Sequence, residues 1–396
     1  MIYLDSAATT AVRREVLEAM WPYLTGDFGN PSSTHSLGER AATALGEARA
    51  TVARLLGARA SEVVFTAGGT EADNLAVKGI ALANPRGRHL VTTPIEHEAV
   101  LESCDYLRRH HGFDVTLLPV DGTGLVDPEQ FAAVLRPDTT LASIMFANNE
   151  IGTVQPVAEL SAIAERAGVP LHSDAVQAAG WLDLDIRRLG LDALTISGHK
   201  LGAPKGIGAL VVRGRLSLEP VLHGGGQERG ARSGTENVAG AVGLATALTL
   251  AERTRVDDAH RVTALRDEFI ATVKSMVPDA LLTGHATSRL PGHASFCFAG
   301  TSGEAVLLEL ERRGVVCSSG SACAAGSDEP SHVLLAVGIE PELAQTAVRF
   351  TFGAGATDGD LQLAAAAVLE SVLAVRRLTP EPSGGARPPR TGVPAT

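Results

Sequence analysis

The sequence predicts an α/β fold with a large domain, whose mainly parallel sheet is sandwiched by helices, and a smaller α+β domain. Between residues 63 and 212, short apolar runs rich in β-branched residues alternate with amphipathic stretches, a pattern typical of parallel sheets covered on both faces. Beyond residue 255 the pattern changes to alternating strands between helices. The 396 residues suffice for two cores, and we expect a large domain at 15–255 and a small domain made of 1–14 and 256–378.

Two helices are expected before the sheet begins. The spacing of Val16, Met20 and Leu24 predicts a helix over residues 14–24. A second apolar face predicts a helix over 39–56, after a turn-rich loop at 26–38. The alternation that follows predicts one helix that ends near residue 80 and three that begin near residues 97, 128 and 156. It predicts strands at 63–65, 89–91, 115–118, 141–146, 169–171, 192–196 and 209–212. Ligands of such a sheet belong at the carboxyl ends of its strands.

The small domain is expected to mix strands and helices. Its predicted helices are 256–276, 304–313 and 360–378, the last capped near Thr357 or Asp358, and its predicted strands are 294–298, 314–317 and 347–352. The N-terminal residues are expected to complete this domain. Residues 379–396 hold five prolines and little that is apolar, which predicts a disordered tail.

Bulk composition narrows the class of function. The net charge of −11 argues against a nucleic acid or an anionic membrane as the main partner. The longest apolar stretch, 239–248, is too short to span a bilayer and is expected to be a core helix, and the N-terminus shows no signal-peptide pattern. The four cysteines form no Cys-x-x-Cys pair and no zinc-binding spacing. We therefore expect a reduced, cytoplasmic protein without a metal site.

Lys200 lies in a loop rich in glycine, between two expected strands, within Ser197-Gly198-His199-Lys200. An amine beside a sheet is partly desolvated, which suits it to form a Schiff base. Ser197 and His199 add donors suited to a phosphate. Such a loop by itself is more often a solvated surface turn, but the groups at the other strand ends favour the chemical interpretation.

Two of those strand ends carry groups that could bind a ligand, namely an anion cradle and an aspartate. Gly69 and Thr70 lie between a strand and a helix, where backbone N–H groups and a hydroxyl form a cradle for an anion, although the pattern is neither a P-loop nor a dinucleotide fingerprint. Asp174 follows a buried strand and is either a helix N-cap or the partner of a protonated pyridine nitrogen. The presence of Lys200 favours the second interpretation of Asp174.

Three further polar residues have both a structural and a chemical interpretation. His97 begins a helix, where it is either structural or able to stack on a ring and shuttle protons. Asn149, in the pair Asn148-Asn149, offers an amide donor or builds a turn. Arg349, inside an apolar strand, requires either a substrate carboxylate or a structural salt bridge.

The most informative part of the small domain is a loop of small residues that follows the strand at 314–317. This loop carries Cys323 without bulky neighbours, which predicts a flexible segment and a thiol that can reach a substrate. Cys317, Cys297 and Cys104 instead fit the pattern of small core hydrophobes.

These motifs together resemble one family. They are Asn30–Ser33, Thr66–Glu71, Glu96–His97, Asn148–Gly152, Asp174–Gln177, Ser197–Lys200, Arg232–Thr235, Ser318–Cys323 and Glu329–His332. In this order they resemble the pyridoxal-phosphate-dependent cysteine desulfurases of the class V aminotransferase family, group I, the NifS/IscS-like branch. The resemblance spans about residues 3–378 and implies the type I fold of pyridoxal-phosphate-dependent transferases, with a seven-stranded sheet.

The resemblance also implies pyridoxal 5'-phosphate as cofactor, L-cysteine as substrate, and L-alanine with an enzyme persulfide as products. Lys200 would form the Schiff base and move the Cα proton, His97 would stack on the ring as acid–base, and Cys323 would attack the substrate sulfur. Asn149 and Arg349 would hold the substrate carboxylate. The remaining cofactor contacts would be Asp174 at the pyridine nitrogen, Gln177 at the ring oxygen, and Gly69, Thr70, Ser197, His199 and, from the partner of a homodimer, Thr235 at the phosphate.

The tail departs from the family pattern. It does not resemble the C-terminus with which housekeeping members dock an iron–sulfur scaffold, so the sulfur acceptor is open: an iron–sulfur cluster scaffold, or a protein of thio-cofactor synthesis or tRNA thiolation. A mobile thiol disfavours an aminotransferase, and the presence of both Lys200 and Cys323 disfavours a non-catalytic sulfur carrier. Selenocysteine lyase activity stays a second possibility, because the same groups could serve it.

Overall fold

The computed structural model describes residues 1–84, 86–320 and 329–378. Its large domain is built on a seven-stranded sheet of order β2-β8-β7-β6-β5-β3-β4. The strands are β2 Val63–Thr66, β3 His89–Thr92, β4 Asp114–Leu117, β5 Thr139–Ser143, β6 Leu171–Asp174, β7 Ala193–Ser197 and β8 Gly208–Val212. Only β8 runs antiparallel to its neighbours, β2 and β7. The prediction of a mainly parallel sheet is confirmed.

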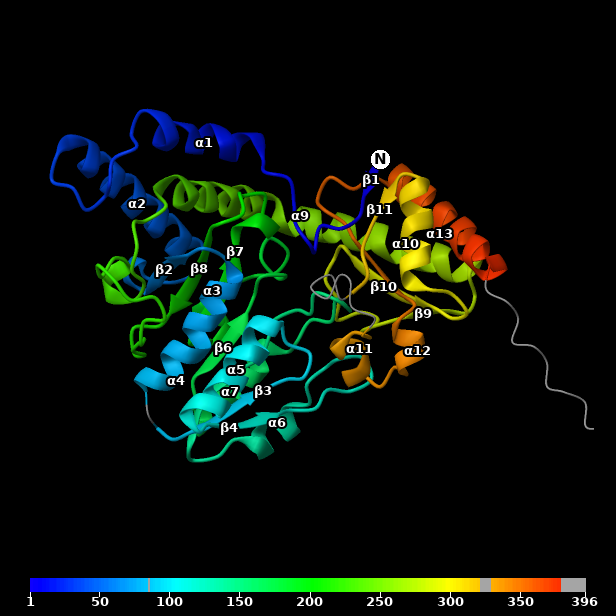
Figure 1. Cartoon of the computed structure of the whole chain (residues 1–396), viewed down its shortest axis with the longest axis horizontal. Coiled ribbons are helices and arrows are strands. Elements are labelled where there is room, and N and C mark those ends of the chain that lie inside the picture. Colours follow the sequence, from blue (N-terminus) through cyan, green and yellow to red (C-terminus); the bar gives the residue numbers. More distant parts are fainter. Residues whose placement is uncertain (85, 321–328, 379–396) are drawn as a thin grey trace, which may run out of the picture.

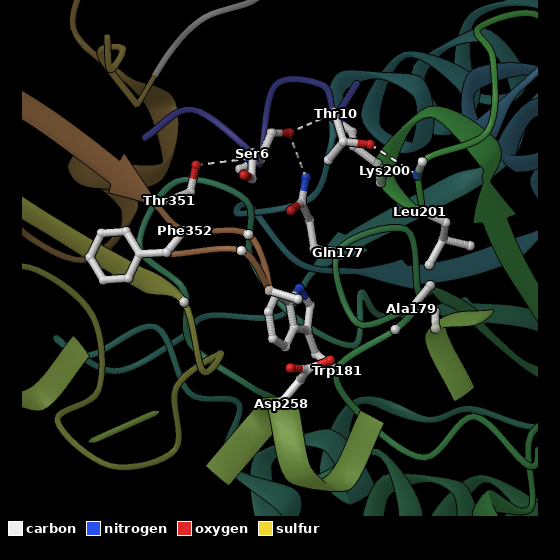
Figure 2. A pocket seen from close by; sticks show the side chains of 18 of the residues that line it. Ser6, Thr10, Gln177, Ala179, Trp181, Lys200, Leu201, Asp258, Thr351 and Phe352 are labelled. Carbon is white, nitrogen blue, oxygen red and sulfur yellow. Dashed lines mark hydrogen bonds between the residues drawn. The ribbon is translucent and has the colours of Figure 1, made fainter. Parts of the chain in front are cut away.

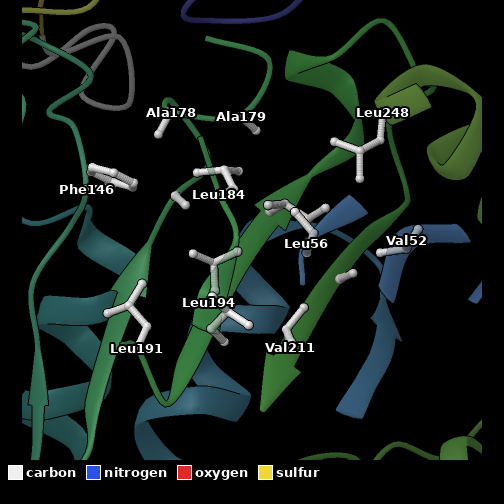
Figure 3. Packing of buried hydrophobic residues seen from close by; sticks show 14 of the residues in the cluster. Val52, Leu56, Phe146, Ala178, Ala179, Leu184, Leu191, Leu194, Val211 and Leu248 are labelled. Atoms are coloured by element: carbon white, nitrogen blue, oxygen red, sulfur yellow. The ribbon is translucent and has the colours of Figure 1, made fainter. Parts of the chain in front are cut away.

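Helices cover both faces of this sheet because its strands are apolar on both sides. On β8, Val211 packs with one core and its neighbour Leu210 with the other. The first core lies under α1 Arg14–Thr25, α2 Ser36–Leu55, α6 Pro128–Val134, α7 Val157–Ala167, α8 Ile186–Leu189 and α9 Val238–Met276. The second core lies under α3 Gly69–Asn74, the π-helical turn Leu75–Gly79, α4 Ile80–Ala83 and α5 Glu98–His111. Figure 3 shows Leu194 and Val211 of the sheet facing Leu56 and Leu248.

Helix α9 joins the two domains (Figure 1). Leu244 and Leu248 belong to the core of the large domain, whereas Val262 and Phe269 belong to the core of the small domain. The prediction of two separate helices, at 239–248 and 256–276, is therefore wrong. The charged residues between them contain no glycine or proline that would interrupt a helix, so the change of composition at residue 255 falls within one continuous helix.

The small domain holds two short sheets. One is antiparallel, of order β12-β10-β9, with β9 Ala280–Leu282, β10 His293–Phe298 and β12 Ala347–Thr351. In the other, β1 Ile2–Tyr3 pairs in parallel with β11 Val315–Val316, so the N-terminal residues supply one strand of this sheet. The strand predicted at 314–317 is shorter than expected and pairs with β1 rather than with β10 or β12. Helices α10 Gly303–Arg312 and α13 Asp358–Leu378 pack on the sheets, and α11 His332–Ala336 and α12 Pro341–Ala344 precede β12.

Some predicted boundaries are shifted for local reasons. The helix predicted over 39–56 begins at Ser36, because the Nδ1 of His35 accepts a hydrogen bond from the Gly38 N–H at 3.2 Å and caps it. The closing helix α13 begins at Asp358, with the Thr357 hydroxyl accepting from the Asp360 N–H as predicted. Within the described ranges, no helix is long and apolar enough to cross a membrane. Cys323 and the predicted tail at 379–396 lie outside the described residues.

Candidate active site

Side chains from the carboxyl ends of several strands surround one cavity of about 510 Å³. As the sequence predicts, residues after neighbouring parallel strands meet at the same edge of the sheet. Of the residues expected to bind cofactor or substrate, the cavity is lined by Gly69, Thr70, His97, Asn149, Asp174, Gln177, Ser197, His199, Lys200 and Arg349. Thr235 is exposed and is not among the lining residues.

Lys200 enters this cavity from a 3₁₀ turn, Gly198–Lys200, that continues β7 directly. Its Nζ donates hydrogen bonds to the carbonyl oxygens of Ala7 and Ala8, at 2.6 Å for Ala8. Ala7 and Ala8 belong to the N-terminal segment, which the fold brings from the small domain. No sequence signal connects that segment with Lys200, so the prediction of the site missed it.

An anion cradle lies beside Lys200. A Cβ placed on Gly69 would meet Val176 Cγ2 at 2.9 Å, so only glycine leaves the backbone open here. The helical stretch 69–83 starts at this glycine, and its first N–H groups favour a negative charge. Burial lowers the pKa of His199 to about 4, and the charges of Lys200 and Lys205 add to the effect. His199 is therefore a neutral donor, and the cradle fits a phosphate group.

Asp174 is buried at the end of β6. One carboxylate oxygen accepts from the Val176 N–H at 2.8 Å, and the residues that follow form turns rather than a helix, so this aspartate is not a helix N-cap. Burial raises its pKa, while the charges of His97 and Lys200 oppose that shift. A buried carboxylate is stabilised by a cation placed against it, and a protonated pyridine nitrogen meets this requirement.

His97 caps helix α5, with its Nδ1 accepting from the Ala99 N–H at 3.0 Å. In a neutral imidazole the proton is then on Nε2, which can act in proton transfer. The two asparagines of the pair differ in what they do. The Asn148 Oδ1 accepts from the N–H groups of Glu150 and Ile151 and builds a turn, whereas Asn149 lines the cavity.

Arg349 on β12 is 2% exposed and forms a salt bridge with Asp5. A structural salt bridge is one of the two interpretations that the sequence allows for this arginine. Its guanidinium donates to Asp5 at 2.9 Å, to the Ser318 hydroxyl at 2.7 Å and to the Asn149 carbonyl at 2.9 Å. Its Nε is buried without a hydrogen-bond partner. Arg349 nevertheless lines the cavity, where a guanidinium can also bind a substrate carboxylate. Asp5, which orients the guanidinium, was not predicted.

The three described cysteines are unsuited to nucleophilic attack. Burial raises the pKa of Cys104 to about 12 and that of Cys297 to about 11. Burial, with the charge of Asp5, also raises the pKa of Cys317. A thiol acts as a nucleophile in its thiolate form, so these residues fit the predicted role of core hydrophobes.

Comparison with known proteins places this site in a family. The family model described as aminotransferase class-V matches residues 2–363. This chain belongs to the class V aminotransferase family. The resemblance drawn from the motifs is thereby confirmed.

Relatives within the class V family are named cysteine desulfurases. The "Cysteine desulfurase IscS" of Dictyoglomus turgidum is 48% identical over 361 residues, covering 91% of each chain. The "IscS-like cysteine desulfurase" of Mycobacterium tuberculosis is 44% identical and covers 98% of this chain and 100% of that relative. Among solved structures, a "NifS-like protein" superposes with a TM-score of 0.87 at 35% identity, covering 94% of this chain and 99% of that one. The structure described as "SspA in complex with cysteine" gives a TM-score of 0.76 at 37% identity, covering 89% and 99%.

This class V family member has a second cavity of about 410 Å³, which Lys200 also lines (Figure 2). Ala7, Gln177 and Lys200 line both cavities, and the Gln177 Nε2 donates to the Ala7 carbonyl at 3.1 Å. The N-terminal segment is therefore part of the wall that holds Lys200 in place.

Proposed function

We propose that this protein is a pyridoxal 5'-phosphate-dependent cysteine desulfurase, which converts L-cysteine to L-alanine and leaves a persulfide on Cys323. The observation that carries the proposal is the convergence of Lys200, Asp174, the anion cradle and Arg349 on one cavity. Its relatives, which are named cysteine desulfurases, support the choice of substrate.

Each part of the cofactor has a fitting group in the cavity. Gly69, Thr70, Ser197 and His199 hold the phosphate, Asp174 holds the pyridine nitrogen, and Gln177 holds the ring oxygen. Lys200 is the residue of covalent attachment. When bound, the cofactor supplies an electron sink for the bonds at the substrate's α-carbon.

The chain itself positions the substrate and moves its protons. Arg349 and Asn149 bind the substrate carboxylate, Lys200 moves the Cα proton, and the Nε2 of His97 exchanges a proton with the reacting groups. The Cys323 thiolate attacks the substrate sulfur, so that an S–S bond forms while the Cβ–S bond breaks. The electron pair of the broken bond stays on Cβ, which takes up a proton and becomes the methyl group of alanine.

Incubation of the purified holoprotein with L-cysteine tests this function. We expect alanine to form in amounts exceeding the protein when a thiol reductant is present to release the persulfide sulfur. L-Selenocysteine, assayed in parallel, measures the selenocysteine lyase activity that the same residues could support. A holoprotein that forms no alanine from L-cysteine would refute the proposal.

Asp174→Asn is expected to slow turnover by about 10²-fold or more, the effect of removing one charge-stabilising group from an active site. The amide keeps the shape of the side chain but cannot hold a proton on the pyridine nitrogen. Alanine release and the visible absorbance of the bound cofactor check this outcome. A variant that turns over L-cysteine at the wild-type rate would leave Asp174 as a turn-forming residue only.

The proposed enzyme is a homodimer. Helix α1 packs Val16 and Met20 on the core, while its outer face and the loop after it expose large apolar side chains: Leu17, Trp21, Leu24 and Phe28. Trp21 is 66% exposed and Phe28 is 65% exposed, and contiguous apolar surface of this kind is typical of an interface. We propose that a second copy covers this face and that Thr235, which is exposed, serves the phosphate of the partner subunit.

Trp21→Glu places a charge in this proposed interface and is expected to shift the protein from dimer to monomer in analytical ultracentrifugation. The affinity of the resulting monomer for the cofactor should fall about tenfold. Separation of the subunits removes Thr235 of the partner subunit, and with it one hydrogen bond to the charged phosphate. Thr235→Ala is the matched control, since it should lower the affinity similarly while the protein stays dimeric. A Trp21→Glu protein that remains dimeric would contradict the assigned surface.

We also propose a cytoplasmic compartment and a protein as the sulfur acceptor. Cys104, Cys297 and Cys317 are free thiols, as expected for a reducing, cytoplasmic environment. The acceptor of the persulfide sulfur is proposed to be a protein, either an iron–sulfur scaffold or a component of thio-cofactor synthesis or tRNA thiolation.

A further inference from the structure

Four buried carboxyl groups of the described residues line the proposed active-site cavity. One of them, Glu150, accepts a hydrogen bond from the Ser331 hydroxyl, and the other three act on one another electrostatically. The proposed mechanism uses only one of these three. Asp73 on α3, Glu96 after β3 and Asp174 at the end of β6 are 1%, 0% and 6% exposed. Asp174 is the partner proposed for the pyridine nitrogen. Asp73 and Glu96 have no role in that account.

The cavity holds too little positive charge for three buried carboxylates. Arg349 is paired with Asp5. The charges of His97 and Lys200 act on Asp174, and that of His97 acts also on Glu96, whereas the charges that act on Asp73 are those of the two other acids. His172, next to Asp73, adds no charge, because burial lowers its pKa to about 3. Since a buried charge without a partner is strongly unfavourable, the arrangement favours one ionised carboxylate and two neutral acids among Asp73, Glu96 and Asp174.

Asp73 and Asp174 share a neighbour, Thr195, and one oxygen of Asp73 has no hydrogen-bond partner. The Thr195 side chain hydrogen-bonds Asp73, and the Thr195 hydroxyl also lies 3.0 Å from the His172 Nε2. Thr195 pairs with Asp174 in the register of β6 and β7, so the same residue adjoins both acids. The Asp73 Oδ1 is buried without a hydrogen-bond partner, which suits an oxygen of a neutral acid.

Glu96 shows the same asymmetry. Its Oε1 accepts from the Thr93 hydroxyl at 2.7 Å and from the Met145 N–H at 2.9 Å. Its Oε2 is buried and accepts nothing, so one oxygen has two donors and the other is available to carry a proton. Burial raises the pKa of Glu96 to about 8, with the charge of Asp174 adding to the shift and that of His97 opposing it. Burial and the charges of Asp174 and Glu96 likewise raise the pKa of Asp73.

We propose that Asp73 and Glu96 are positioning residues that stay protonated at neutral pH, with their protons on Oδ1 and Oε2, so that Asp174 is the single carboxylate among the three acids. This inference rests on the proposed function, since the pyridine nitrogen is the cation that Asp174 meets. Two neutral neighbours direct that nitrogen to one anion.

Three matched variants of the full chain are stripped of cofactor and titrated with pyridoxal 5'-phosphate at neutral pH. Their dissociation constants are compared with that of the wild type. Asp73→Asn and Glu96→Gln replace a neutral acid by a neutral amide of the same shape, so each should change the dissociation constant by less than about tenfold, the equivalent of one pKa unit. Asp174→Asn removes a charge and should weaken binding by more than that. A loss beyond about tenfold in Asp73→Asn or Glu96→Gln would overturn the proposal.

Thermal unfolding of the same stripped proteins at several pH values tests protonation without the cofactor. The groups that face Glu96 are Asp174, His97 and Cys104, and those that face Asp73 are Asp174, Glu96 and His172. Because the folded pKa of Glu96 is raised from 4.5 to about 8, its contribution to stability is complete below 4.5 and is lost as the pH rises to about 8. Wild-type protein should therefore lose melting temperature relative to Glu96→Gln across this range.

A difference in melting temperature that stays constant between pH 4.5 and about 8 would show that Glu96 is ionised in the folded protein and would overturn the proposal. Asp73→Asn tests the same claim independently, so misfolding of one variant leaves the other decisive. Wild-type protein that binds no cofactor would refute the proposed function instead, and the unfolding series would still decide whether these acids are protonated.

Discussion

Replacing Lys200 by alanine is expected to abolish covalent attachment of the cofactor and to lower L-cysteine turnover by about 10⁴-fold or more. Proton transfer by one positioned side chain contributes up to about 10⁴-fold, and Lys200 is both the attachment point and the proposed carrier of the Cα proton. The protein should still fold, because water can replace the Lys200 ammonium at the carbonyl oxygens of Ala7 and Ala8. Loss of the yellow colour of the holoprotein and of alanine release are the readouts.

Lys205 provides the matched control for this prediction. It lies in the same loop, is exposed, and is not among the residues that line the cavity, so Lys205→Ala should retain colour and activity. Borohydride reduction of the wild-type holoprotein, followed by peptide mass spectrometry, identifies the modified lysine. A cofactor fixed to Lys205 would show that the wrong lysine was chosen.

Cys323→Ser is expected to separate the two halves of the reaction. Cofactor attachment and substrate binding use Lys200 and Arg349, so this variant should still bind the cofactor and change its visible spectrum when L-cysteine is added. Alanine release should fall about 10²-fold or more, because a serine hydroxyl is a far weaker nucleophile than a thiol that is a few per cent ionised at neutral pH. No persulfide should be detected.

Cys317→Ser is the control for the loss of a thiol. Cys317 lies on the small-domain core, and burial raises its pKa, so it is not expected to take up sulfur. Its replacement should cost about 1 kcal/mol of stability, as for a polar group placed in a buried site, and leave desulfuration intact. Full turnover by Cys323→Ser would contradict the assignment of the nucleophile.

The sequence predicts the architecture because its strands carry local signals. Runs such as 141–146 are largely apolar on both faces, and their alternation with helices predicts a parallel sheet. The continuity of α9 is not predicted, since charges near residue 255 indicate solvent exposure without revealing whether the backbone continues as a helix. The short elements β9, α11 and α12 carry too few residues for a periodic pattern.

The candidate site is predicted where strand ends carry recognisable groups, as for Lys200 and Asp174. Asp5, Asp73 and Glu96 escape prediction because their importance depends on tertiary contacts. Asp5 reaches Arg349 across 344 positions of the sequence, and nothing in the residues around it indicates that distance. Glu96 precedes a predicted site residue, His97, but its burial is evident only in the folded protein.

The most direct test of the account is a single turnover of the wild-type holoprotein with sulfur-labelled L-cysteine and no reductant. Alanine is measured in solution, and the labelled cysteine is located by mass spectrometry under non-reducing conditions. We expect one persulfide on Cys323 for each alanine formed, since the S–S bond arises as the Cβ–S bond breaks. A persulfide on Cys317 or Cys104, or alanine formed without any labelled cysteine in the protein, would contradict the account.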